Sequence, residues 1–464
     1  MKRVLLTVHK FFPEHRSGTE VLTLKVAQEL QRRGYETLVV TANPPDRDAR
    51  FKGGPQTSSY EYEGVKVYVL EEALRLKENQ FVSEFDNPWI KKHFQSVLKE
   101  FAPDIVHIFH AQNLSASIIV AALEQDLPVV ISTTDFWFIC PVVQLKRPDG
   151  SICRGPSPGA INCLTCYTPA LFPPAQEFQE ALGKKFPIIQ KVIDQFPPLL
   201  SKFANQANYA AYVASKLPAA ATATMTRPGV LRKAANSVSA IMVPTLLMRD
   251  LFIENGLDPK LIHHVPFGID TTSLESFQIK TKSELLRIGF IGTLYEHKGV
   301  DLLIKAFLKL PPEAKACLQI YGDTKQFPDY ANSLIKLANN GSPNSTKITF
   351  AGTFPNAQLG QVLSNLDVLV VPSRWYENTP LVIQSALATK TPIIATNLGG
   401  MSELVHHNKN GLLFNLNDVD SLHAQLLRLL NEPRLLPKLA AAITPERTTQ
   451  EMVDQIESIY NITC

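Results

Sequence analysis

One carboxylate, Glu377, lies in a segment whose residue types could do chemistry. It follows the apolar run 366–371 and precedes Thr379-Pro380. The run predicts a buried strand, whereas Thr379 suits the N-cap of a helix and Pro380 suits its first position. Unpaired backbone N–H groups at such a helix start attract phosphate or developing negative charge. The segment predicts an active site around Glu377; the alternative is an ordinary strand-loop-helix connection with an exposed acid.

Two further loops repeat this order of strand, glycine-bearing loop and helix. Lys298 lies in the loop 292–299, before a predicted helix at 301–308, where a cation and backbone N–H groups would neutralise a diphosphate. The alternative is a solvent-exposed loop lysine. The glycine pair 399–400 follows a predicted strand at 393–395 and either lets the backbone approach a ligand closely or forms a plain turn.

Length and composition indicate a globular chain of more than one domain. Its 464 residues exceed one comfortable hydrophobic core, and 45% of them are apolar. The formal charge of +3 is the difference between 46 basic and 43 acidic residues, which is too small to indicate a nucleic-acid partner.

The apolar segments are short. The run that starts at Val4 ends at His9-Lys10, too early for a signal peptide. No window of the sequence approaches the about 20 uninterrupted apolar residues that a membrane-spanning helix needs. We therefore expect a cytoplasmic protein, for which peripheral contact with the inner face of the membrane stays open.

Alternating apolar runs and helical patterns predict an α/β fold with two doubly wound domains. Ligands of such sheets bind beyond the carboxyl ends of the strands, so two facing domains would place a site in the cleft between them. The predicted divisions are an N-terminal domain at 1–275 with a cysteine loop at 140–166 and a helical insert at 170–236, a C-terminal domain at 285–440, and a C-terminal helix at 441–464 that packs back on the N-terminal domain.

Several short motifs occur along the chain in a specific order. They are Lys298-Gly299-Val300, Tyr321-Gly322-Asp323, Phe350-Ala351-Gly352, Val371-Pro372-Ser373, Glu377-Asn378-Thr379-Pro380, Gly399-Gly400 with Glu403, and Asn410-Gly411-Leu412-Leu413-Phe414. On these motifs the chain resembles glycosyltransferase family 4, retaining enzymes of the GT-B fold, across nearly its whole length. The GT-B fold has two Rossmann-like domains that face a central cleft.

The resemblance implies a nucleoside-diphosphate sugar as donor and a polysaccharide, a glycolipid or a related glycan or lipid-linked molecule as acceptor. It implies transfer with retained anomeric configuration and without a catalytic metal, since a lysine and helix N-termini stabilise the departing nucleoside diphosphate. The residues to which it assigns catalysis are Glu377, His110 and Lys298. The residues to which it assigns donor binding are Gly18, Thr293, Lys298, Tyr376, Asn378, Thr379, Pro380, Leu381 and Ser385.

Two of these residues belong to the N-terminal domain. Gly18 follows the first predicted strand and lets the backbone approach donor or acceptor; the alternative is a helix start capped by Ser17 or Thr19. His110 ends a predicted strand at 105–109 and could face the sugar or the acceptor, although a histidine at a strand end is often structural.

Three positions depart from the family pattern. Ser385 stands where the family has a second Glu that binds ribose, Thr293 where many members have Arg, and Thr134 where they often have His. Charge-assisted hydrogen bonds are roughly twice as strong as neutral ones, so Ser385 should hold ribose more weakly or with a different geometry. The alternative function is a catalytically silent GT-B protein that binds a sugar nucleotide or a partner protein. The retained Glu377 and Lys298 favour the enzyme.

A cysteine cluster follows an Asp-Phe-Trp-x-x-Cys-Pro segment. Its members are Cys140, Cys153, Cys163 and Cys166. A C-x-x-C pair with two further cysteines predicts a structural zinc site, and four reduced thiols are the alternative. Disulfides are disfavoured without a secretion signal. Cys317 and Cys464 are unrelated to this cluster.

Overall fold

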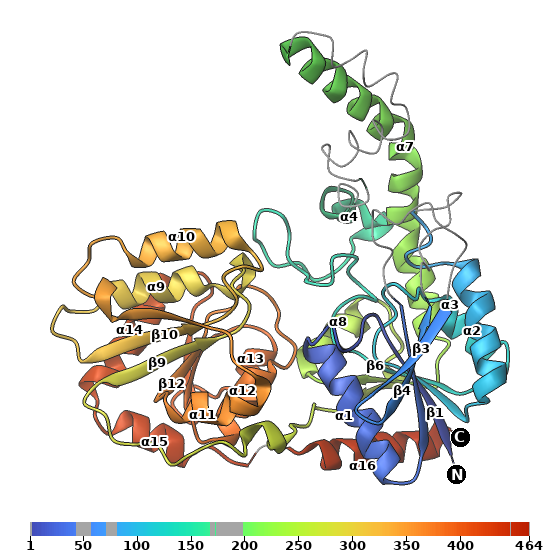
Figure 1. Cartoon of the computed structure of the whole chain (residues 1–464). Helices are drawn as coiled ribbons and strands as arrows, with labels where there is room; N and C mark the ends of the chain where they lie inside the picture. Colours follow the sequence, from blue (N-terminus) through green and yellow to red (C-terminus); the bar gives the residue numbers. More distant parts are fainter. Residues whose placement is uncertain are drawn as a thin grey trace.

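Two sheets organise the chain (Figure 1). The computed structural model describes residues 2–42, 57–70, 81–167, 172, 198–445 and 447–463. An eight-stranded sheet has the order β3-β4-β2-β1-β5-β6-β7-β8, and a six-stranded sheet has the order β11-β10-β9-β12-β13-β14. All pairings are parallel except the antiparallel pair of β3 and β4. The predicted α/β class with two doubly wound domains is confirmed.

The N-terminal sheet consists of β1 (Arg3–Val8), β2 (Glu36–Thr41), β3 (Thr57–Tyr62), β4 (Val65–Leu70), β5 (Ile105–Ile108), β6 (Val129–Ser132), β7 (Ala240–Val243) and β8 (Ile262–His264). Its helices are α1 (Gly18–Arg32), α2 (Pro88–Phe101), α3 (Ser117–Leu123), α4 (Ile161–Cys166), α7 (Pro198–Ala235) and α8 (Leu246–Glu254). Strands β5, β6 and β7 are buried along their whole length, because helices cover both faces of the sheet.

The C-terminal sheet consists of β9 (Leu286–Ile291), β10 (Ala316–Tyr321), β11 (Ile348–Gly352), β12 (Val368–Val371), β13 (Ile393–Thr396) and β14 (Gly411–Phe414). Its helices are α9 (Val300–Leu308), α10 (Pro328–Ala338), α11 (Leu359–Ser364), α12 (Leu381–Ala388), α13 (Gly400–Leu404), α14 (Val419–Asn431) and α15 (Leu435–Ala441). Helices α9, α10, α14 and α15 share one core with the sheet, and α11, α12 and α13 share the other.

Short 3-10 helices span Pro158–Ala160, Pro259–Leu261, Thr271–Leu274, Glu296–Lys298, Ser345–Lys347 and Asn356–Gln358.

The last helix, α16 (Thr449–Thr463), crosses back to the N-terminal domain and lies against α1 (Figure 1). Its apolar side chains join the core that α1 shares with β1 and β2. Within this core Nδ1 of His107 and the hydroxyl of Tyr460 lie 2.6 Å apart. The C-terminal end of the chain therefore belongs to the core of the first domain.

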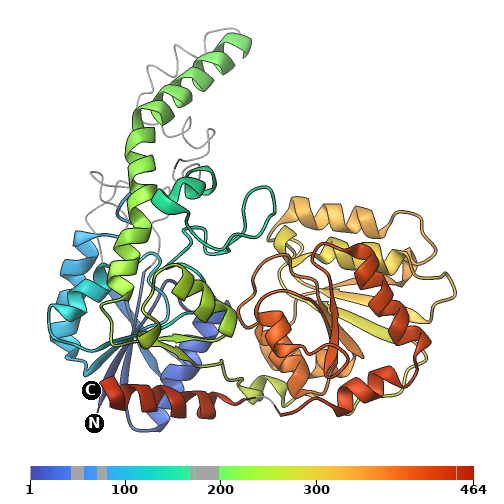
Figure 2. The same ribbon diagram turned by 180° about the vertical axis from the view of Figure 1, so that it is seen from behind.

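Helix α7 projects away from the rest of the N-terminal domain in both ribbon views (Figures 1 and 2). Its inner part buries Ala220, Ala223 and Leu231 in the domain core. Of the predicted insert at 170–236, residues 170–171 and 173–197 lie outside the described residues. None of the described helices is both long and apolar enough to cross a membrane.

Candidate active site

The loop between β12 and α12 holds the carboxylate of Glu377 at the carboxyl end of the C-terminal sheet. Three donors converge on its Oε1. They are Nζ of Lys298 at 2.6 Å, Oγ of Ser373 at 2.7 Å and Nε1 of Trp375 at 2.8 Å. Burial would raise the pKa of Glu377, but the Lys298 charge and these hydrogen bonds outweigh burial and lower the pKa below its ordinary value. Glu377 is therefore a buried carboxylate that keeps its charge.

Lys298 reaches Glu377 because its loop is pressed against the end of β12. Gly299 adopts φ 68°, and a Cβ there would lie 2.0 Å from the carbonyl oxygen of Pro372, so only glycine fits without displacement. The ammonium of Lys298 also lies 5.3 Å from the centre of the Trp375 ring. Burial and the nearby Lys298 lower the pKa of His297 to about 4. His297 is therefore uncharged at neutral pH, and Lys298 is the cation beside Glu377.

The helix start differs from the prediction by one residue. Helix α12 begins at Leu381, and its N-cap is Pro380 with ψ 112°, rather than Thr379. The preceding loop is tied to α13, since the backbone N–H of Gly400 donates to the carbonyl of Glu377 at 2.9 Å. This tertiary contact keeps the chain extended through Pro380, and no side chain caps the helix.

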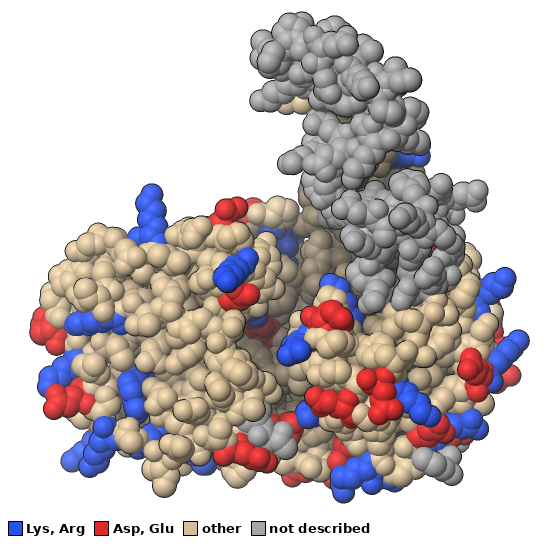
Figure 3. Space-filling model, in the orientation of Figure 1, with Lys and Arg blue, Asp and Glu red and all other residues tan. Residues whose placement is uncertain are grey.

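The same loop contacts the N-terminal domain. Nδ2 of Asn378 donates to the carbonyl oxygen of Thr134 at 2.7 Å. Tyr376 is buried among N-terminal core residues, with its ring 6.1 Å from that of Phe136. At Gly18 a Cβ would lie 3.7 Å from Leu381, so the start of α1 faces the start of α12. The loop 372–380 therefore lies at the junction of both domains. The space-filling view shows a hollow between the two lobes of the molecule (Figure 3).

His110 lies on the N-terminal side with both ring nitrogens engaged. The backbone N–H of Gln112 donates to Nδ1 at 2.9 Å, so the ring proton is on Nε2, which donates to Asp135 at 2.6 Å. The His110 side chain is 3% exposed and that of Asp135 is 24% exposed. Asp135 is therefore the member of this pair that a ligand would reach, and His110 orients it.

Two donor-binding candidates, Ser385 and Thr293, make hydrogen bonds that serve the fold. Oγ of Ser385 donates to the carbonyl of Leu381, one turn earlier in α12, at 2.9 Å, so its only proton is used. Thr293 lies in the turn before the 3-10 helix, and its carbonyl accepts from the backbone N–H of Tyr295 at 3.0 Å. A ribose could use only the lone pairs of Ser385.

Two residues that hold Glu377 were not predicted from the sequence. Ser373 and Trp375 lie within four positions of Glu377 and carry hydroxyl and indole donors, which are the types that a buried carboxylate needs. That proximity was the available signal. Proximity alone does not identify them, because the direction of each side chain depends on the path of the loop.

The four clustered cysteines line one cavity of about 20 Å³. Sγ of Cys153 accepts from the backbone N–H of Gly155 at 3.4 Å. Burial and the neighbouring cysteines raise the pKa of Cys163 to about 12, so its thiol is neutral unless a cation is near. Within the described ranges, no three His, Cys, Asp or Glu side chains are arranged to hold a metal. Cys317 lies apart in β10, and Cys464 is outside the described residues.

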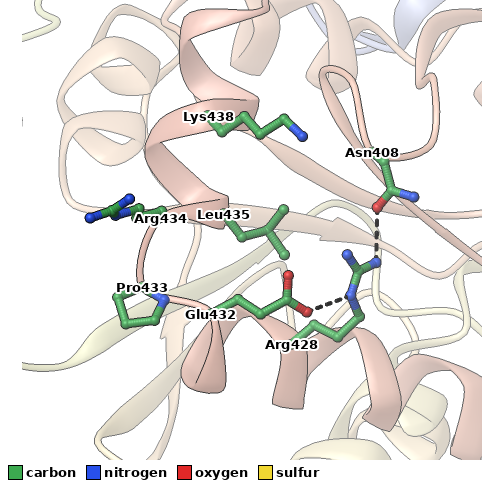
Figure 4. A pocket seen from close by; sticks show the side chains of 7 residues that line it. All are labelled: Asn408, Arg428, Glu432, Pro433, Arg434, Leu435 and Lys438. Carbon is green, nitrogen blue, oxygen red and sulfur yellow. Dashed lines mark hydrogen bonds and ion pairs between the residues drawn. The ribbon is translucent and has the colours of Figure 1, made fainter.

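A wider cavity of about 660 Å³ lies between the ends of α14 and α15 (Figure 4). The guanidinium of Arg428 there is held by Glu432 and Asn408, each at 2.9 Å. No residue of the loops that hold Lys298 and Glu377 lines it. Its size does not make it the site, because Lys298 and Glu377 lie elsewhere.

Two family models match the chain. The model described as Glycosyltransferase Family 4 matches residues 16–148, and the model described as Glycosyl transferases group 1 matches residues 286–432. The first match contains His110, and the second contains Lys298 and Glu377. Each domain therefore carries its own match.

Curated relatives and a solved structure agree with these matches. The alpha-maltose-1-phosphate synthase of Mycolicibacterium smegmatis is 28% identical over 217 residues, which are 44% of this chain and 55% of the relative. The MMP alpha-(1->4)-mannosyltransferase of Mycolicibacterium hassiacum is 29% identical over 191 residues, 41% of this chain and 44% of the relative. The chain thus spans about half the length of these curated relatives. The crystal structure of HepE from Anabaena in complex with UDP and glucose has a TM-score of 0.63 and 15% identity, with both chains covered completely.

The fold is GT-B, as the sequence predicted. The two domains that compose it are similar to glycosyltransferase domains, and the paired Lys298 and Glu377 lie in the second of them.

Proposed function

We propose that the protein is a glycosyltransferase that takes a sugar from a nucleoside-diphosphate sugar and transfers it to an acceptor with retention of anomeric configuration. The observation that carries the proposal is the pair of Lys298 and Glu377, 2.6 Å apart beside the start of α12. This pair brings a cation for phosphate and a carboxylate for sugar hydroxyls together from two different loops.

The donor would bind by exchanging partners with this pair. The three protein donors to Glu377 all reach Oε1, and within the described part of the chain Oε2 has no such bond, so a sugar hydroxyl could donate to it. Lys298 and the first N–H groups of α12 would neutralise the diphosphate and stabilise it as it leaves. HepE, whose structure contains UDP and glucose, supports this donor class.

The acceptor proton would pass to an oxygen of the leaving phosphate. His110 cannot take it as the ring stands, because both of its nitrogens are engaged by Gln112 and Asp135. We assign His110 to orienting Asp135, and Asp135 to binding the acceptor. This positioning role differs from the catalytic role that the sequence predicted for His110.

We propose a glycan or lipid-linked acceptor, approached from the N-terminal domain. One relative is named for amylovoran biosynthesis and another for the synthesis of maltose-1-phosphate. These names support a carbohydrate acceptor for this protein. A lipid-linked acceptor would bring the protein to the inner face of a membrane, which co-sedimentation with vesicles containing the acceptor tests.

The experiment for the donor assignment is release of nucleoside diphosphate from uridine, guanosine and adenosine diphosphate sugars, with thermal-shift binding in parallel. We expect one donor to be turned over, and Lys298→Met to weaken its binding by about tenfold or more, since hydrogen bonds to charged groups contribute about 1.5–3 kcal/mol.

Lys309→Met is the matched control, because Lys309 pairs with Asp420 on the exposed side of the same domain. Equal losses in both variants would contradict the assignment. Binding without release of nucleoside diphosphate would instead favour the catalytically silent GT-B protein. The residues that favour this alternative are Thr134, Thr293 and Ser385.

We also propose that the four clustered cysteines take up one zinc ion as thiolates. The supporting observation is that all four line one small cavity. A zinc ion would lower the pKa of the thiols and draw the sulfurs together as ligands. We expect one zinc per chain by elemental analysis, its loss in Cys163→Ser and its retention in Cys317→Ser. Sub-stoichiometric zinc in the unmodified protein would refute the proposal.

A further inference from the structure

One acidic side chain joins the two domains without belonging to the donor site. Glu403 lies in α13 of the C-terminal domain, and its carboxylate accepts two backbone N–H groups of the N-terminal domain. Oε2 accepts from Leu246 and Oε1 accepts from Leu247, each at 2.8 Å. These are the first two residues of α8. A carboxylate from one domain thus caps a helix of the other.

The cap completes the hydrogen bonding of the α8 start. Thr245, the N-cap residue of α8, satisfies the next N–H, that of Met248, at 3.1 Å. The remaining two first-turn groups depend on Glu403, because the first N–H groups of a helix have no partner within it. A negative charge at this position also interacts favourably with the helix dipole.

Helix α13, which carries Glu403, is also hydrogen-bonded to the loop 372–380 that holds Glu377. The N–H of Gly400, which begins α13, donates to the carbonyl of Glu377 at 2.9 Å. At Gly399 a Cβ would lie 3.2 Å from Leu247 and 3.0 Å from Tyr376, so α8 and the loop meet at this point. A displacement of α8 from α13 would therefore reach the loop that holds Glu377.

The two hydrogen bonds from Leu246 and Leu247 to Glu403 exist only while the domains are in contact. If the domains separate, the Leu246 and Leu247 N–H groups and the carboxylate return to water together. An interaction made in one conformation and absent from another shifts the balance toward the first. The neighbouring bond from Asn378 to Thr134 acts in the same direction, but it is neutral and hence weaker.

We propose that Glu403 is a positioning residue that holds the cleft closed by capping α8 across the domain junction. The consequence for turnover rests on the proposed function, whereas the consequence for domain closure does not. Opening for exchange of donor and product would break both bonds, and closure would remake them.

The test compares Glu403→Ala, Glu403→Gln and Thr245→Ala by small-angle X-ray scattering and by the distance between spin labels placed on the two domains. We expect Glu403→Ala to lower the ratio of closed to open molecules on the order of tenfold or more, with a larger radius of gyration. Glu403→Gln should restore part of the closure, because its amide offers one acceptor oxygen.

Thr245→Ala is the matched control, since it weakens the same helix end without touching the domain junction. A Glu403→Ala protein that stays as closed as the unmodified protein would overturn the proposal, and so would an equal opening in Thr245→Ala. Where turnover is measurable, Glu403→Ala should lower kcat while nucleoside-diphosphate affinity stays within about twofold, because Lys298 and Glu377 are unchanged. Scattering needs no activity, so a failed glycosyltransferase assay leaves this test intact.

Discussion

At the scale of single residues, the main feature of the candidate site is a carboxylate that stays charged while buried. Glu377 is 8% exposed, yet its pKa lies below the ordinary value because Lys298 and two neutral donors favour the ionised form more than burial opposes it. A carboxylate held in this way is ready to accept hydrogen bonds from a ligand, without first losing a proton.

This pKa shift gives stability a dependence on pH. Since the folded pKa of Glu377 is lower than its unfolded pKa, its contribution is full above the ordinary value of 4.5 and is lost as the pH falls through the folded pKa. We expect Glu377→Gln to lower the free energy of unfolding by about 2 kcal/mol at neutral pH. The difference from the unmodified protein should shrink below the ordinary pKa of 4.5. Urea unfolding across this pH range measures it, and a difference that grows with acidity would contradict it.

At the scale of elements, one glycine brings the lysine loop to the end of β12. The position of Gly299 combines a left-handed φ with a close approach to the carbonyl of Pro372. The approach of Lys298 to Glu377 depends on it, because the two residues lie on different loops that follow different strands.

The expected consequence is a difference between two glycine substitutions. Gly341 also has a left-handed φ, of 84°, but a Cβ there would meet nothing within 4 Å. Gly341→Ala should cost about 1–2 kcal/mol of unfolding free energy from φ alone. Gly299→Ala should cost more and should also weaken nucleoside-diphosphate binding, which thermal unfolding and a binding titration measure. Equal effects of the two changes would show that the contact with Pro372 does not matter.

At the scale of the whole molecule, the two domains are joined by more than a linker. Helix α16 returns to the first domain, and Glu403, Asn378 and Tyr376 reach it from the second. The residues expected to bind the donor thus sit where movement of one domain against the other is felt. Domain position should therefore be coupled to turnover.

The return of α16 predicts a stability effect in the N-terminal domain from the far end of the chain. Tyr460 is fully buried and contacts His107. Tyr460→Ala should lower the free energy of unfolding of that domain by about 3–5 kcal/mol. Ile462→Ala is the control, because Ile462 is 79% exposed and should change the free energy by less than about 0.5 kcal/mol. Urea unfolding followed by tryptophan fluorescence measures both, and a silent Tyr460→Ala would mean that α16 is not part of the core.

The sequence by itself determined the two βα series, the order of the strands within the chain and the loops at which Glu377 and Lys298 lie. Each of these follows from local periodicity and from turn residues, which act over a few positions. The same local signals misplaced the start of α12 by one residue, since they carry no record of the contact between Gly400 and Glu377.

Only the tertiary structure decided which groups meet. It joined Lys298 to Glu377 across 79 positions and Glu403 to Leu246 across 157. It also occupied both nitrogens of His110 and the hydroxyl proton of Ser385, which changes what each can offer a ligand. The physical reason is that hydrogen bonds and ion pairs depend on distances of a few ångströms between side chains, and these distances are set by the packing of strands and helices that are remote in the chain.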